Sequence, residues 1–314
     1  MLRGSASRNW MLSLPAFVLA LLLATLTSLL SPSFLTDANL ANLANRALPL
    51  GLVALGEAIV LFAGRIDLSV GATMSLATAL MATLSPTLGW LAVPPALGAG
   101  ALAGAVTAFG VFALRINPLI MSLATGAIIQ GAALLVLPSP GGEVDYAFYA
   151  LLFEADRLLG PALFILVACY ALATLAMGWT RPGRVLYAFG SDAHAAFANG
   201  IATSRVDLSA YVLSGLLAAA AGVILSIRIL SGDPLIGVPY TLDAVAAAIL
   251  GGVALSGGRG APLGVLFAAV SLVFIGNMFN LLDLDTNLQA IVRGLIFILA
   301  LVFFMRGKAA EGVS

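Results

Sequence analysis

The side chains with the greatest capacity for chemistry are ionisable groups inside apolar stretches. Glu57 and Arg293 lie within such stretches, Asp243 begins another, and Asp67 follows Arg65 in a short polar break. An ionisable group in an apolar span is costly, and it usually pairs with another group or marks a transport path. We expect Arg293 to pair with an acid such as Glu57, and we favour structural pairing over direct contact with a solute.

Neutral polar side chains in the same stretches leave two alternatives open. Asn277 and Asn280 are three residues apart and share one face of a helix, where their amides either bond solute hydroxyls or bridge helices. Gln130 has the same two alternatives. Asp67 is expected to accept hydrogen bonds from backbone N–H groups near Ser69, as a turn and cap residue. The candidates for a translocation path or its support are Glu57, Asp67, Ser69, Gln130, Asp243, Asn277 and Asn280.

Chemistry that needs thiols, imidazoles or amines has almost no residues available. The chain has one cysteine, Cys169, one histidine, His194, and one lysine, Lys308. An internal disulfide and a structural zinc site are therefore excluded, and no stretch reads GxxxxGK[ST], the loop that holds nucleotide phosphates. We expect Cys169 to fill apolar space and His194 to lie at the surface. The sequence predicts no catalytic residue, no metal ion, no cofactor and no enzyme activity.

The composition indicates a membrane protein. Of the 314 residues, 61% are hydrophobic and 9% are charged, and the mean hydropathy is +1.10, whereas soluble domains carry roughly 25% charged residues. The 14 basic and 14 acidic residues cancel, so there is no excess charge to attract polyanions. These numbers exclude a soluble enzyme, a disordered chain and a nucleic-acid-binding module, and they favour a single polytopic domain over residues 1–314.

The apolar stretches predict an all-α fold with about ten transmembrane helices, because a spanning helix needs about 20 mostly apolar residues. The first stretch lacks a small-x-small cleavage site before Pro32, so we expect a retained helix rather than a signal peptide. The stretch 242–256 is short and flanked by glycines, which means that it is either shielded by its neighbours or broken within the membrane. The expected spans are 11–30, 45–63, 68–85, 90–114, 117–137, 161–179, 208–229, 242–256, 260–282 and 286–305.

The distribution of charge predicts that both termini are cytoplasmic. With the N-terminus inside, ten of the 14 basic residues fall in cytoplasmic segments, in accord with the positive-inside rule. These are Arg3, Arg8, Arg65, Arg115, Arg181, Arg184, Arg205, Arg259, Arg306 and Lys308. The outer segments hold the acids Asp37, Glu143, Asp145, Glu154, Asp156, Asp233, Asp283 and Asp285. The opposite orientation would reverse this bias.

Residues 180–207 form the only long cytoplasmic loop in this topology. Ser191 or Asp192 is placed to cap a short helix, and Gly200 to end it in the left-handed conformation. Phe197 would present one aromatic side chain among small ones. Such a helix is a docking surface for a partner, and the alternative is a plain connecting loop. The docking residues would be Gly190, Asp192, Ala195, Ala196, Phe197, Gly200 and Ile201.

Glycines are concentrated near two of the expected cytoplasmic turns. They permit close approach of helices and irregular backbone, so they indicate either tight packing or a hinge beside the pathway. Segments 63–72 and 257–265 each combine glycine with an arginine, which hints at an internal repeat. The glycines concerned are Gly64, Gly71, Gly251, Gly252, Gly257, Gly258 and Gly260.

Four segments, taken together, are specific enough to indicate a protein family. They are GEAIVLFAGRIDLSVG (56–71), RPGRVLYAFGSDAHAAFANGIATSRVD (181–207), LDAVAAAILGGVALSGGRGAPLG (242–264) and GNMFNLLD (276–283). Together they resemble the permease subunits of ribose-type ABC importers, in the superfamily of branched-chain amino acid and sugar permeases. The resemblance runs in order from about 37 to 305. Three positions depart from it: Arg65 replaces the usual glycine, Asp192 the usual asparagine, and Phe197 a common basic residue.

The resemblance implies a type II ABC importer permease that moves a monosaccharide, such as a pentose, or a related polyol across the bacterial inner membrane. It also implies partners: two ATP-binding-cassette ATPase domains docked on 180–207, a second permease, identical or related, and a periplasmic substrate-binding protein. Two alternatives stay open. A secondary transporter driven by an ion gradient usually needs several intramembrane carboxylates, and Glu57 is the one clear example. An intramembrane enzyme has few suitable residues here.

We expect Asp145 and Asp192 to lie on opposite sides of the membrane, because the charge distribution places them so. In a chain that carries Cys169→Ala, an impermeant maleimide should label Asp145→Cys in intact cells. It should label Asp192→Cys only after the membrane is permeabilised. Labelling of both positions from the same side would contradict the predicted topology.

Overall fold

The computed structural model describes residues 10–153, 160–285, 288–289, 291–292 and 294–295. Within these residues every named element is a helix, and the one extended pairing is an isolated antiparallel bridge between Gly141 and Gly232. The expected all-α fold is therefore confirmed for the described part of the chain.

Seven helical stretches of the described residues are long and apolar enough to cross a membrane. They are Met11–Leu30, Asp37–Phe62, Val70–Phe112, Pro118–Val136, Pro161–Trp179, Thr203–Ile229 and Pro262–Leu281. The third contains two helices, α4 (Val70–Leu88) and α5 (Val93–Phe112), joined by the 3-10 turn η3 (Gly89–Ala92). The expected last span, 286–305, lies mostly outside the described residues, so the total of ten spans and the cytoplasmic termini stay predictions.

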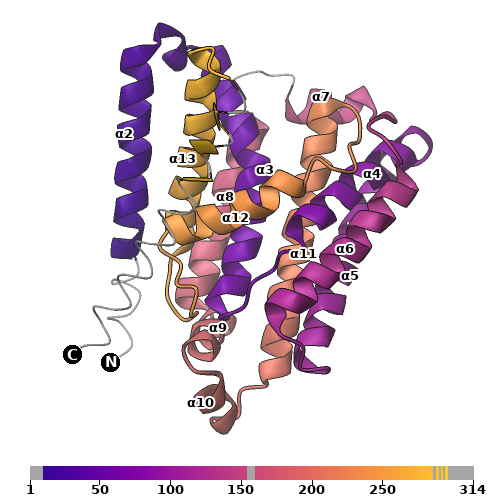
Figure 1. Cartoon of the computed structure of the whole chain (residues 1–314), viewed down its shortest axis with the longest axis vertical. Coiled ribbons are helices and arrows are strands. Elements are labelled where there is room, and N and C mark those ends of the chain that lie inside the picture. Colours follow the sequence, from indigo (N-terminus) through magenta and orange to yellow (C-terminus); the bar gives the residue numbers. More distant parts are fainter. Residues whose placement is uncertain (1–9, 154–159, 286–287, 290, 293, 296–314) are drawn as a thin grey trace.

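The helices stand largely side by side, with α10 at one end of the molecule and α7 at the other (Figure 1). The remaining long helices are α2 (Leu14–Leu30), α3 (Asp37–Phe62), α6 (Pro118–Val136), α8 (Pro161–Trp179), α11 (Thr203–Ile229) and α13 (Pro262–Leu281). The shorter elements are η1 (Trp10–Ser13), η2 (Pro32–Leu35), α7 (Tyr146–Leu152), α9 (Arg181–Ser191), α10 (Ala193–Ala198) and α12 (Val238–Leu250).

Helices α3 and α11 form the centre of the bundle. Every side chain of α3 from residue 47 to residue 62 is buried, as expected of a helix that is apolar on all sides and surrounded by others. Helix α3 packs against α8, α11, α12 and α13, and α11 packs against α3, α4 and α5. The other helices are thus placed around these two.

Glycines bring α5 and α11 together at backbone distance. A Cβ atom at Gly100 would collide with the carbonyl oxygen of Gly215, and one at Gly104 would collide with that of Tyr211. Small residues are the usual means of close helix packing in membranes, where no hydrophobic effect drives helices together. This crossing therefore has no space for a side chain at either glycine.

Polar residues extend two helices beyond the limits that hydropathy predicted. Helix α3 begins at Asp37 rather than at residue 45, because the Thr36 side chain caps it by accepting a hydrogen bond from the Asn39 N–H (3.4 Å). Helix α11 begins at Thr203 rather than at residue 208, so it includes Asp207. Apolar periodicity alone does not locate such polar first turns.

The expected short span 242–256 is α12, which has 13 residues and begins four residues earlier than expected. At 1.5 Å per residue it covers about 20 Å, which is less than the roughly 30 Å of a hydrocarbon core. The irregular segment before it, 230–237, is satisfied by α4: Thr78 donates to the Asp233 carbonyl (2.8 Å), and the Gly237 N–H donates to Ser75 Oγ (2.9 Å). Buried irregular backbone requires such partners.

The expected loop 180–207 contains two helices and the first turns of α11. The sequence prediction missed α9, which begins where the Thr180 side chain accepts a hydrogen bond from the Gly183 N–H (3.4 Å). It correctly placed the short helix α10 between Asp192 and Gly200. Both helices lie at one end of the bundle (Figure 1).

The α5–α11 crossing yields a stability prediction. Gly100→Ala should destabilise the protein by roughly 1–3 kcal/mol, because the new methyl group overpacks a closed contact. Gly98→Ala is the matched control on the same helix, since a Cβ at Gly98 meets no atom within 4 Å. The thermal unfolding midpoint in detergent should fall for Gly100→Ala alone, and equal midpoints for the two variants would contradict the packing described.

Candidate functional site

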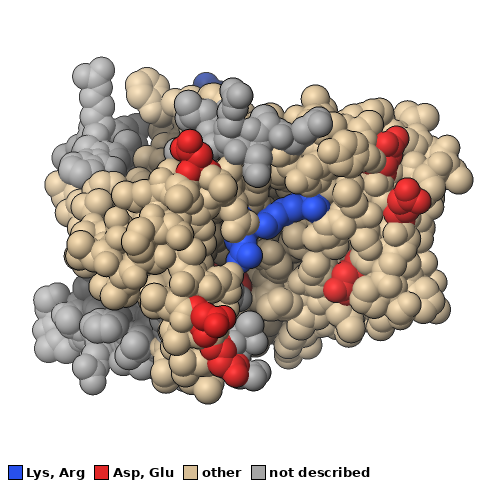
Figure 2. Space-filling view, turned by 90° about the horizontal axis from the view of Figure 1, so that it is seen from above, with Lys and Arg blue, Asp and Glu red and all other residues tan. Residues whose placement is uncertain are grey.

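A polar cavity of about 480 Å³ lies among α3, α11, α12 and α13. Its charged lining comprises Arg46 from α3, Arg228 from the last turn of α11 and Asp243 from α12, and Tyr240 of α12 lies beside them. Seen from above, basic side chains lie in a central hollow and acidic side chains are spread around it (Figure 2). The cavity is therefore at the end of α11 that is far from α10.

Asp67 organises the connection between α3 and α4. Its Oδ1 accepts hydrogen bonds from the Ser69 N–H (3.0 Å) and the Ser69 hydroxyl (2.6 Å). Its Oδ2 accepts a hydrogen bond from the Ser214 hydroxyl of α11 (3.0 Å). The predicted hydrogen bond from the Ser69 N–H to Asp67 is thus confirmed, whereas the N-cap residue of α4 is Ser69 itself rather than Asp67. Ser214 is an additional partner that the sequence did not reveal.

Glu57 is buried in α3 and faces the same connection. Its Oε1 accepts a hydrogen bond from the Asp67 N–H (3.3 Å), and its Oε2 has no hydrogen-bond partner in the described part of the chain. The partner expected from the sequence, Arg293, lies outside the described residues. No group of three or more His, Cys, Asp or Glu side chains among the described residues is placed to hold a metal ion.

Arg65 forms an ion pair that the sequence prediction missed. Its Nε lies 3.0 Å from Asp207 Oδ1, and a second nitrogen lies 3.4 Å from Oδ2, so the contact is two-pronged. The guanidinium carbon also lies 5.3 Å from the centre of the Phe189 ring. Asp207 was missed because the predicted span began at residue 208. An acid at the edge of an apolar stretch was the available signal.

For two of the three amide side chains considered in the sequence analysis, the structure favours the alternative in which the amide bridges separate segments of the protein. Asn277 of α13 and Asn39 of α3 exchange hydrogen bonds (2.7 and 3.2 Å), and the Gln130 amide donates to the Pro234 carbonyl (2.5 Å). Asn280 is exposed and does not join the pair. The alternative of solute contact by Asn277 and Gln130 therefore has no geometric support here.

Four glycines bring three segments into backbone contact, and we call this contact the glycine junction: Gly64, Gly190, Gly257 and Gly258. A Cβ at Gly190 would collide with the Phe62 carbonyl oxygen, and one at Gly257 would lie 2.6 Å from the Cα of Gly64. The Gly258 N–H donates to the Phe62 carbonyl (3.0 Å). The end of α3, the end of α9 and the α12–α13 connection are thus joined. Of the glycines expected to pack closely, Gly71 also meets Gly237 at backbone distance, and Gly251 meets Val265.

Helix α9 adds side-chain contacts to the junction. The Tyr187 hydroxyl donates to the Gly260 carbonyl (2.9 Å), and the Tyr187 and Phe62 rings lie 5.1 Å apart between centres. Burial raises the pKa of Tyr187, so its hydroxyl stays protonated and remains a donor. Helix α9 is therefore held to both α3 and the α12–α13 connection.

Helix α10 extends beyond α9 into solvent. The Asp192 carboxylate caps it by accepting a hydrogen bond from the Ala195 N–H (2.9 Å), and Gly200 ends it with φ +80°. Both caps were expected from the sequence. Ala196 is buried, whereas 70% of the Phe197 surface is exposed. The helix thus presents one large apolar side chain to the outside.

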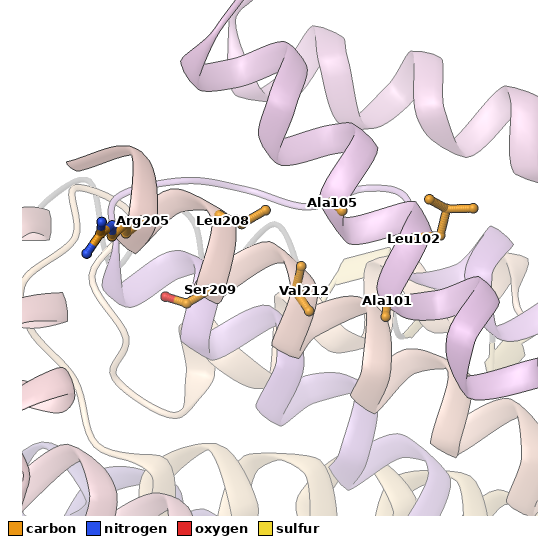
Figure 3. A pocket seen from close by; sticks show the side chains of 7 residues that line it. All are labelled: Ala101, Leu102, Ala105, Arg205, Leu208, Ser209 and Val212. Carbon is orange, nitrogen blue, oxygen red and sulfur yellow. The ribbon is translucent and has the colours of Figure 1, made fainter. Parts of the chain in front are cut away.

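Two other hollows are apolar and lie near the start of α11. One, of about 590 Å³, is lined by Ala101, Leu102 and Ala105 of α5 and by Leu208 and other residues of α11 (Figure 3). The second, of about 600 Å³, lies among α3, α8, α9 and α11. Their linings offer few hydrogen-bonding groups, which suits hydrocarbon better than a solute rich in hydroxyls.

Comparisons with known proteins place this architecture among permeases. A protein-family profile described as "Branched-chain amino acid transport system / permease component" matches residues 39–301. The ribose import permease protein of Escherichia coli K12 is 32% identical over 303 residues, which cover 94% of each chain. That of Bacillus subtilis 168 is 35% identical over 313 residues, covering 96% of this chain and 94% of the relative. The L-arabinose transport system permease protein of Escherichia coli K12 is 34% identical over 276 residues, covering 87% and 84%.

The hydrogen bond from Ser214 to Asp67 can be tested against a serine on the same helix. Ser214→Ala should cost roughly 1–3 kcal/mol, because a buried carboxylate oxygen loses its donor. Ser226→Ala is the control: Ser226 is equally buried, but its hydroxyl donates to the Val223 carbonyl of its own helix. The thermal midpoint should fall clearly further for Ser214→Ala, and similar shifts for both would show that the Asp67 contact adds no stability.

Proposed function

This chain belongs to the family of branched-chain amino acid transport system permease components, and from this premise we propose that it is the membrane-spanning subunit of an ATP-driven importer. It is a multi-pass protein of the inner membrane, and its relatives are sugar permeases. The proposed solute is a monosaccharide or a related polyhydroxy compound. ATP hydrolysis would occur on separate subunits, since this chain has no phosphate-binding loop.

The observation that carries the proposal is a continuous mechanical path through the protein. Helix α3 ends at the glycine junction, and its Arg46 lines the polar cavity, which the predicted topology places on the periplasmic side and which we call the outer cavity. Helices α12 and α13 join the junction through their connection and line the same cavity. Rigid helices that share a contact at one end transmit its displacement to the other end. A movement of the junction would therefore reshape the cavity.

Helix α10 is the proposed input of this path. An ATPase subunit that seats α10 in a cleft would move α9 with it, because Asp192 is the single residue between the two helices. Helix α9 would in turn displace the glycine junction through Gly190. We propose two such ATPase domains, one on each of two permease chains, which are identical or related.

The outer face suits the proposed docking of a periplasmic binding protein. Exposed acids from several connections lie at this end, including Asp37, Glu143, Asp145 and Asp283, and acidic side chains surround the central hollow (Figure 2). Complementary charges on a partner steer its approach and fix its register more than they add affinity. A binding protein with basic side chains around its cleft would therefore place its solute over the cavity.

A proton-driven secondary transporter is the second candidate, and one observation favours it. Glu57 and Asp67 are both buried and lie close together, since the Asp67 backbone N–H donates to Glu57 Oε1, and buried carboxyl groups are the usual members of a proton relay. However, neither residue lines the outer cavity. The pair supports the connection between α3 and α4 and has no described route to the solute.

Phe197→Asp should abolish both ATPase association and ATP-driven uptake. A carboxylate at the centre of a desolvated contact would remain unpaired, at a cost of several kcal/mol, which weakens association more than 100-fold. Association is measured by co-purification with the ATPase subunit, and uptake by radiolabelled sugar in proteoliposomes with ATP enclosed. Membrane insertion and chain abundance should be unchanged, because Phe197 is exposed.

Phe197→Leu is the matched control, because it keeps an apolar anchor, and it should retain most of the association. Wild-type uptake should require ATP and should persist when a protonophore removes the proton gradient. Uptake that needs the gradient but no ATP would establish the second candidate. Normal co-purification and uptake by Phe197→Asp would place the docking surface elsewhere.

A further inference from the structure

Two arginines from different helices converge on one oxygen in the outer cavity. Asn42 and Arg46 are one turn apart on α3, and the Arg46 Nε donates to Asn42 Oδ1 (3.3 Å). A guanidinium nitrogen of Arg228, from α11, donates to the same oxygen (3.0 Å). The two donor nitrogens are therefore at most about 6 Å apart, a distance at which like charges repel appreciably.

Neither arginine forms an ion pair with an acid among the described residues. The ion pair found there joins Arg65 and Asp207, so neither Arg46 nor Arg228 has a described carboxylate oxygen within 4.0 Å. A neutral Asn42 amide supplies an acceptor but no charge. Two neighbouring guanidinium groups that line a cavity and form no ion pair with a described acid are a preorganised site for an anion.

We propose that the outer cavity binds a monosaccharide that carries a carboxylate, a uronic or aldonic acid, through Arg46 and Arg228. This inference rests on the proposed importer function and narrows its solute class. The guanidinium fork matches the two oxygens of a carboxylate, and it discriminates an acid from a neutral sugar of the same shape.

The charge of the cavity favours a carboxylate over a phosphate. The lining also holds one acid, Asp243, beside the two arginines, and its carboxylate repels a doubly charged anion more strongly than a singly charged one. A carboxylate carries one negative charge, whereas a phosphate monoester carries about −1.5 to −2 at neutral pH. Asp243 and Tyr240 of α12 line the same cavity and add to its polar character.

The acids of the outer face do not oppose this assignment. They surround the hollow (Figure 2), and exposed charges are screened beyond about 8 Å at physiological salt. Under the proposed function the solute arrives inside a binding protein rather than by free diffusion. The arginines therefore act on the anion only once it is at the cavity.

The test compares acids with neutral sugars of the same stereochemistry on the purified full-length permease. The probes are D-galacturonate with D-galactose, D-glucuronate with D-glucose, and D-gluconate, each at concentrations up to tens of millimolar. The readout is the shift in the thermal unfolding midpoint of the permease at low salt. At least one acid should stabilise the wild type, and its neutral counterpart should bind at least tenfold more weakly. Arg46→Gln should weaken binding of that acid at least tenfold, and Arg46→Lys, which keeps the charge but not the fork, should have a smaller effect.

Arg184→Gln is the control, because Arg184 is exposed on α9 and lies outside the cavity. This variant should bind the acid normally.

If Arg46 has a merely structural role, Arg46→Gln would lower the midpoint without probe and leave the acid preference intact, which would overturn the proposal. Equal binding of acids and neutral sugars, no binding of any acid, or tighter binding of D-galactose 6-phosphate would overturn it as well. If ATP drives uptake of a neutral sugar and Arg46→Gln leaves that uptake unchanged, the proposed acid site is rejected and the proposed importer function is retained. Selective acid binding without ATP-driven uptake would reject the importer alone.

Discussion

Inside a bundle of packed helices the backbone has little access to water, so neighbouring protein groups must satisfy each buried break in a helix. This chain interrupts its helices at 63–69, 230–237 and 251–261. The first break is held by Ser214 of α11 through Asp67, the second by serine and threonine side chains of α4, and the third by the carbonyl of Phe62. Each break thereby ties together helices that are distant in the sequence, and the arrangement of the bundle depends on these ties.

Close approach of backbones is the second consequence of the same constraint. A break that touches another backbone leaves no room for a Cβ atom, and glycines stand at such contacts. Gly71, in the first turn of α4, meets Gly237, and Gly64 meets Gly257 where two breaks come together. The segments 63–72 and 257–265, whose sequences echo each other, meet at the second of these contacts. An internal repeat would produce such a contact, and the repeat stays a hypothesis.

The sequence predicted the parts of the site that are local. The Asp67–Ser69 turn and the Asp192 cap need partners only two or three residues away, so residue type and spacing suffice to predict them. Partners that are remote in the chain were not predictable: Asn39 and Asn277 are 238 residues apart, Arg65 and Asp207 142, and Arg228 and Asn42 186. Hydropathy also placed the starts of α3 and α11 too late, because their first turns are polar and are stabilised by a cap or an ion pair.

Helix α3 shows how one element serves both ends of the proposed path. Its first turns carry Arg46, which lines the cavity, whereas residues 47–62 are buried and lead to the glycine junction. Pro49 lies between these two parts, inside the helix. Proline removes one backbone hydrogen bond and clashes with the carbonyl four residues before it, so helices bend there. A displacement of the buried part would therefore change the direction of the Arg46 segment, and Arg46 would move relative to Arg228, which belongs to a different helix.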